Sequence, residues 1–140
     1  MLKWAVLQVA INLPPVKTLT KVIMGMKNIG GKHVKLSANN DGEMTAQVET
    51  DAASIVSVFT QLSNVTMVDD GDAETSQDVE RKAMHSVWVD IRSLLLFLLN
   101  QQLTSSRLVL QIVANRMALF VIDQEDEGLL LQYSIPGVSL

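Results

Sequence analysis

Hydrophobic and polar positions along the chain repeat one order of elements twice. A strand-like segment, a short amphipathic helix and three further strand-like segments are predicted over about residues 4–62, and the same order returns over about 83–136. Every predicted element has an apolar face, so each half can bury a layer of side chains. The pattern predicts an α+β protein of two βαβββ repeats, with antiparallel sheets and both helices packed on one side.

The first half contains a predicted helix over residues 16–28. It follows a strand at 4–13, which Pro14 and Pro15 end because proline lacks the amide proton that a strand ladder needs. Apolar side chains recur on one face of this helix, and the opposite face carries Lys17, Lys21, Met24 and Asn28. Gly30 and Gly31 are predicted to end it.

Three strands then complete the first half. Residues 33–39 and 43–50 are predicted to form a hairpin, because the intervening Asn-Asp-Gly tolerates the positive φ angles of a tight turn. A third strand follows at 53–62. The polar, acid-rich segment at 69–82 shows no periodicity and is predicted to be a loop between the halves.

The second half begins with a strand at 84–91 and a helix at 91–102. Asp90 is placed to cap this helix, since a carboxylate accepts hydrogen bonds from free amides of the first turn. Its predicted buried side chains are Leu94, Leu95, Phe97, Leu98 and Leu99, and a narrow outward stripe holds Arg92, Ser93, Leu96 and Asn100. Three strands are predicted at 107–114, 117–123 and 129–135.

Composition and charge narrow the function. The 140 residues suit one domain, and the absence of cysteine excludes disulfides, thiol nucleophiles and cysteine-ligated metals. The net charge is −4, yet residues 1–40 hold six lysines and no acidic residue. Such asymmetry suggests a surface that faces a polyanion. The alternative is an ordinary solvated lysine-rich face.

No enzyme site is predicted. His33 and His85 fall in separate strands without metal-ligand spacing, and Gly30-Gly31 lacks the flanking residues of a phosphate loop. The sequence gives no catalytic residue, no metal ligands and no cofactor. The apolar run at 94–99 is too short to span a membrane, and the amino terminus lacks the pattern of a secretory signal.

Four tracts, in order, resemble one known family. They are residues 13–28 (LPPVKTLTKVIMGMKN), 39–50 (NNDGEMTAQVET), 89–102 (VDIRSLLLFLLNQQ) and 131–139 (LQYSIPGVS). Together they are similar to the carboxyl-terminal half of the Hus-one subunits of the nine-one-one DNA-damage checkpoint clamp. The likeness runs from about Ala10 to the carboxyl terminus.

The resemblance implies a DNA sliding-clamp domain, similar to one half of a proliferating-cell nuclear antigen subunit. In that family the helices line a hole for double-stranded DNA, which makes Lys17, Lys21, Lys27 and Arg92 the candidate DNA-facing residues. The implied assembly is a nuclear heterotrimer with two other checkpoint-clamp subunits. It is placed on DNA by a clamp loader without reading sequence and recruits repair enzymes, with no catalytic activity and no membrane association of its own.

Two departures from the family leave an alternative open. A family subunit has two such domains and this chain holds one, so we expect a truncated isoform, an incomplete gene product or an excised domain. Ser93 and Leu96 also make the outward stripe of the second helix less positive than a DNA-facing surface favours. The alternative is a protein-interaction module that pairs with a clamp partner through a sheet edge and never encircles DNA. The candidate edge residues are Ser54, Val56, Val58 and Thr60.

Overall fold

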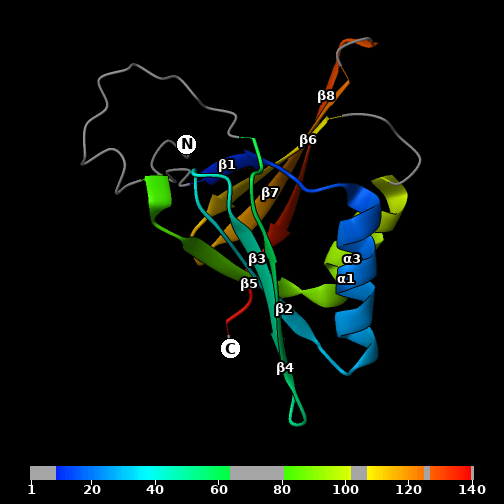
Figure 1. Ribbon diagram of the computed structural model, residues 1–140. Coiled ribbons are helices and arrows are strands. Elements are labelled where there is room, and N and C mark those ends of the chain that lie inside the picture. Colours follow the sequence, from blue (N-terminus) through cyan, green and yellow to red (C-terminus); the bar gives the residue numbers. More distant parts are fainter. Residues whose placement is uncertain (1–8, 64–80, 102–106, 125–126, 140) are drawn as a thin grey trace.

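A computed structural model describes residues 9–63, 81–101, 107–124 and 127–139. The first half contains β1 (Val9–Asn12), α1 (Val16–Asn28), β2 (His33–Ala38), β3 (Met44–Glu49) and β4 (Ser54–Phe59). The second contains β5 (His85–Asp90), α3 (Ile91–Gln101), β6 (Arg107–Val113), β7 (Met117–Gln124) and β8 (Leu129–Pro136). These elements form two four-stranded antiparallel sheets beside a pair of helices (Figure 1). The α+β prediction with two βαβββ repeats is confirmed.

The two halves exchange their first strands. The sheet orders are β1-β6-β7-β8 and β4-β3-β2-β5, which we call sheet A and sheet B. β1 pairs with β6 of the second half, with Val9 opposite Ile112, and β5 pairs with β2 of the first, with Val89 opposite Val34. Each half therefore supplies an edge strand to the sheet of the other, and neither sheet is complete without both halves.

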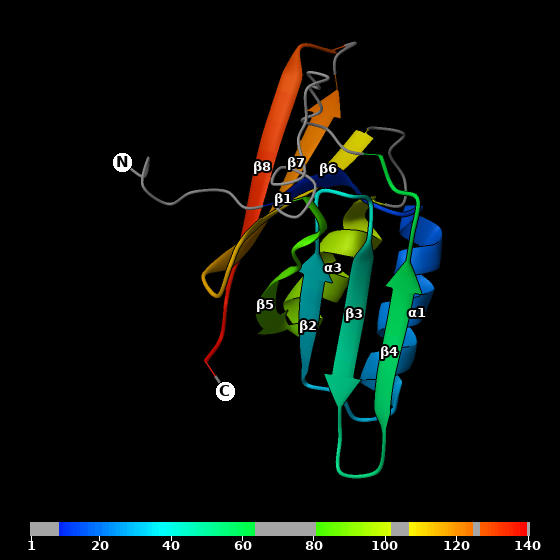
Figure 2. The ribbon, with the colours of Figure 1, turned by 60° about the vertical axis from the view of Figure 1, so that its left-hand side comes forward.

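The helices pack against each other and against the inner faces of the sheets. Both lie on one side of the sheets, next to each other and running in opposite directions (Figures 1 and 2). Leu19, Ile23 and Met26 of α1 are buried in one core. The same core holds Leu94, Phe97 and Leu98 of α3. Burial of one face of each helix leaves the opposite faces as an outer layer, as the pattern predicted.

Several strands are shorter than predicted. Residues 4–8 of the first predicted strand lie outside the described residues, and Leu13 lies beyond the end of β1. β4 ends at Phe59, so the candidate edge residue Thr60 is outside the strand. The cause is a bend: Gln61 has φ of +64°, and the Leu62 amide donates to the carbonyl of Gly42 at 3.0 Å. The predicted acidic loop lies outside the described residues except for Arg81 and Lys82.

The prediction for Leu99 is wrong. Its side chain is 43% exposed, whereas the neighbouring Leu94, Leu95, Phe97 and Leu98 are buried as predicted. The apolar pattern suggested that α3 is buried around most of its circumference. The sheets and the neighbouring α1 bury a smaller part of it. Leu99 therefore joins Leu96, which is 61% exposed, on the outer surface.

Candidate nucleic-acid interface

The exposed face of α1 carries three lysines. Lys17 and Lys21 are one helical turn apart and both exposed, opposite the buried Leu19 and Ile23. Residues four apart lie on the same face of a helix, so the two ammonium groups project in similar directions. Lys27, in the last turn, is also exposed and suits the negative end of the helix dipole. α1 thus presents positive charge along its length.

The exposed face of α3 carries one positive charge. β5 runs directly into α3, and the carboxylate of Asp90 accepts hydrogen bonds from the Ser93 amide at 3.0 Å and hydroxyl at 3.1 Å. This cap satisfies a free amide of the first turn, next to the exposed Arg92. Farther along, Leu96 and Leu99 are exposed, so the outer surface of α3 is mainly apolar beyond its first turn.

The helix layer has a charge opposite to that of the whole protein. α1 and α3 together contain four basic residues and no acidic residue, while the chain as a whole has a net charge of −4. Because the helices run in opposite directions, the first turn of α3 lies at the same end of the layer as the last turn of α1 (Figure 1). Arg92 belongs to that turn of α3 and Lys27 to that turn of α1. We call the exposed Lys17, Lys21, Lys27 and Arg92 the helix-layer cations.

The other lysines of the amino-terminal segment do not extend this surface. Lys32 lines a pocket on the outer side of sheet B, and the Lys35 ammonium lies 6.0 Å from the centre of the Trp88 ring on neighbouring β5. Lys3 lies outside the described residues. The described lysines of residues 1–40 are therefore divided between two surfaces of the fold.

β4 is an edge strand of sheet B. It pairs only with β3 in the sheet order, while its other edge has no strand beside it within the described part of the chain. Ile55 and Phe59 point toward the core, whereas Val56 is 51% and Val58 is 63% exposed and Ser54 is also exposed. An exposed edge with apolar side chains is a template for a further strand. Three of the four candidate edge residues, Thr60 excepted, thus lie on such an edge.

The two histidines lie apart in sheet B. β2 pairs with β5 so that His33 faces Asp90 and Ala38 faces His85, which puts the two histidines at opposite ends of one strand pair. Among residues 9–63, 81–101, 107–124 and 127–139, no three histidine, aspartate or glutamate side chains are grouped to hold a metal ion. No helix in those ranges is long and apolar enough to cross a membrane.

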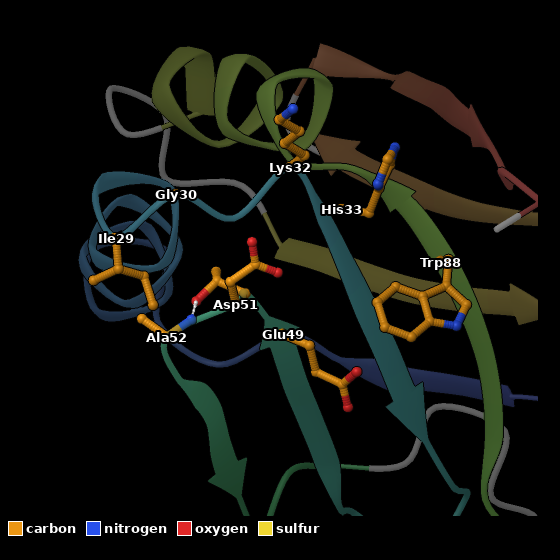
Figure 3. Close-up of a pocket in the computed structure, with 9 residues that line it drawn as sticks. Ile29, Gly30, Lys32, His33, Glu49, Asp51, Ala52 and Trp88 are labelled. Carbon is orange, nitrogen blue, oxygen red and sulfur yellow. Dashed lines mark hydrogen bonds between the residues drawn. The ribbon is translucent and has the colours of Figure 1, made fainter.

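A pocket on the outer side of sheet B was missed by sequence reasoning. Its volume is about 720 Å³, and Ile29, Lys32, His33, Glu49, Asp51 and Trp88 are among its lining residues (Figure 3). We call it the outer-face pocket. These residues come from three separate parts of the chain, so no local spacing marks them as a group. The only available signal was Trp88, an aromatic side chain on the less buried face of a predicted strand.

Comparison with known proteins gives two findings. A family described as Hus1-like protein matches residues 3–139. The human (Homo sapiens) "Checkpoint protein HUS1" is 37% identical over 131 residues, which cover 94% of this chain and 45% of that protein. The chain therefore spans about half the length of the curated relative that it matches.

Proposed function

The chain belongs to the Hus1-like family, and on that premise we propose that it acts as a non-enzymatic subunit of a checkpoint sliding clamp. In this proposal the chain joins two other checkpoint-clamp subunits in a heterotrimeric ring around double-stranded DNA. The ring works in the nucleus, is placed on DNA by a clamp loader, and supports checkpoint signalling and repair enzymes. The observation that carries the proposal is the helix layer, with four cations and no acid in an acidic protein.

The helix-layer cations suit contact with phosphates. Lysine and arginine side chains bind the DNA backbone through charge, and such contacts position a protein without reading bases. Each neutralised phosphate contributes a limited, salt-dependent share of the affinity. Four cations on one chain bind DNA weakly, so useful retention requires that other subunits add similar surfaces around the duplex. This requirement favours a ring over a single bound chain.

The β4 edge offers a way to join a neighbouring subunit. A partner strand that pairs with β4 would satisfy its free backbone groups and cover Val56 and Val58, which are both more than half exposed. The edge belongs to sheet B, whereas the exposed helix-layer cations belong to α1 and α3, which pack on one face of that sheet (Figure 2). Subunit pairing and DNA contact therefore use different surfaces.

Assembly on circular DNA tests this proposal. The chain is co-expressed with the two other checkpoint-clamp subunits, and the purified assembly is loaded with its clamp loader onto nicked circular DNA. We expect the assembly to stay on the circle at high salt and to leave when the DNA is linearised, because only an encircling ring slides off an end. A chain that binds its partners and never remains on circular DNA would contradict the proposal.

A second candidate function is a module that binds one clamp partner through β4 without encircling DNA. The exposed Leu96 and Leu99 favour this second function, because the surface of α3 beyond its first turn has no positive charge that could contact DNA. This module would be captured by a single partner subunit. Its capture would be unchanged by Lys17→Glu and Lys21→Glu, and those substitutions would have no effect on DNA retention.

A further inference from the structure

In the outer-face pocket, basic side chains and carboxylates lie on different walls. Lys32 directly precedes β2 and His33 begins it, while Glu49 ends β3 and Asp51 lies in the turn to β4 (Figure 3). Within the described part of the chain, none of these four side chains forms an ion pair. The one hydrogen bond of the Glu49 carboxylate is accepted from Gln47 Nε2 at 3.2 Å. The pocket therefore holds two carboxylates, one ammonium and one imidazole that are available to a ligand.

The backbone around the pocket is fixed. The link from α1 to β2 passes so close to β3 that a Cβ on Gly31 would lie 2.5 Å from Val48 Cγ1. The Lys32 carbonyl accepts a hydrogen bond from the Ile91 amide at 3.0 Å. On the other wall, the Thr50 hydroxyl accepts from the Ala53 amide at 3.1 Å and closes the turn that holds Asp51. A rigid site loses little conformational entropy when a ligand binds.

Trp88 supplies an apolar surface beside these charges. Its indole is half buried on the outer face of β5, and the Val138 amide donates to its carbonyl at 2.9 Å, which holds the backbone in place. Ile29 is 41% exposed at the other end of the pocket (Figure 3). Half-buried aromatic side chains anchor many protein interfaces, since they bury a large apolar area with few rotatable bonds.

We propose that the outer-face pocket binds an extended peptide segment of another protein, one that carries a basic, an apolar and an acidic side chain on the same face. The basic group pairs with Glu49 and Asp51, the acidic group pairs with Lys32 and His33, and the apolar group covers Trp88. Alternate residues of an extended chain point the same way, about 7 Å apart, which suits such a triplet. The two carboxylates disfavour a phosphate or a nucleic acid, because they repel anions. This inference does not depend on ring assembly or on DNA binding by the helix layer.

To test this proposal, capped peptides are added to the ¹⁵N-labelled full chain, and the amide and indole signals are followed by NMR. The probes are Ser-Lys-Ser-Glu-Ser-Leu-Ser and its reverse, because Lys32 and His33 lie between the two carboxylates and Trp88 across the sheet. A control replaces both charged residues with glutamine. We expect one charged probe to bind at least about tenfold more tightly than the control, which corresponds to about 1.4 kcal/mol. The shifts should centre on Gly30, Thr50, Ala52 and the Trp88 indole.

Charge variants complete the test. Glu49→Lys with Asp51→Lys should lower the affinity for the charged probe to that of the glutamine control, since both side chains are exposed and tolerate lysine. The matched control is Asp41→Lys with Glu127→Lys, two exposed acids outside the pocket, and it should bind as the parent chain does. The proposal is overturned if neither charged probe exceeds the glutamine control. It is also overturned if both variant pairs lose binding equally, or if inorganic phosphate alone shifts the same signals as strongly.

Discussion

The carboxylate of Asp90 holds Ser93 by two hydrogen bonds, one from its amide at 3.0 Å and one from its hydroxyl at 3.1 Å. Asp90 is the last residue of β5, and α3 begins at the next residue. The strand therefore turns into the helix without a connecting loop, and the cap fixes the first turn that carries Arg92. These two hydrogen bonds thus fix the junction between sheet B and the helix surface that we propose faces DNA.

Removal of this cap should destabilise the fold. We expect Asp90→Ala to lower the free energy of unfolding by about 0.5–2 kcal/mol, since a free amide of the first turn loses its partner. Asp90→Asn keeps an acceptor oxygen and should retain most of the stability. Urea denaturation of the three proteins measures the difference. Equal stability of Asp90→Ala and the parent chain would show that the cap contributes nothing.

The same substitution at two glycines should have opposite effects. At Gly31 a Cβ would lie 2.5 Å from Val48 Cγ1 and 2.8 Å from the Met26 carbonyl oxygen, both fixed in the core. Gly31→Ala should therefore cost about 1–3 kcal/mol of unfolding free energy through overpacking. At Gly25, inside α1, a Cβ meets no atom within 4 Å, so Gly25→Ala should add about 0.5–1 kcal/mol.

Thermal and urea unfolding of both glycine variants check this pair. Gly25→Ala serves as the control for Gly31→Ala, because the side chain added is identical and only the surroundings differ. Loss of stability at Gly25 as large as that at Gly31 would contradict the packing described for the link between α1 and β2.

A charge on the β4 edge should block partner binding and leave the fold intact. Val58 is 63% exposed, so Val58→Lys changes stability by no more than about 0.5 kcal/mol. A partner strand would bury the new ammonium beside an apolar surface, and we expect at least about a tenfold loss of affinity for the neighbouring clamp subunit. The control is Met84→Lys, which places the same charge at an exposed apolar position outside β4. The two variants are compared by pull-down and calorimetry with each clamp subunit. Equal binding by both variants would exclude β4 as the interface.

Local signals in the sequence were enough to predict the helices. The observed bounds of α1 are the predicted ones, because Pro15 precedes it and a glycine pair follows its amphipathic run. The start of α3 was predicted from Asp90, whose carboxylate caps the first turn of that helix. By contrast, the pairing of β1 with β6 and of β5 with β2 has no periodic signal, since it depends on which strand edges meet in space.

The wrong predictions concern residues whose burial or strand membership depends on neighbours that are distant in sequence. Leu99 has the same side chain as the buried Leu98, and only the extent of the neighbouring sheets decides that one is exposed and the other is not. Thr60 continued a β-like pattern, yet the chain bends directly after it, at Gln61, where the Leu62 amide bonds to the Gly42 carbonyl. Likewise, the charge count left open how the lysines of residues 1–40 are arranged, and the fold divides the described ones between α1 and the outer side of sheet B.

The salt dependence of binding to a random-sequence DNA duplex, compared between two variants of equal charge, decides whether α1 faces DNA. The first is Lys17→Glu with Lys21→Glu on the helix layer, and the second is Lys32→Glu with Lys35→Glu on the outer side of sheet B. If the helix layer contacts the phosphates, the first pair should lower affinity by more than about tenfold and reduce the slope of log affinity against log salt by about 2. The second pair should leave that slope nearly unchanged. Equal losses from both pairs, or no loss from the first, would contradict a DNA-facing role for α1.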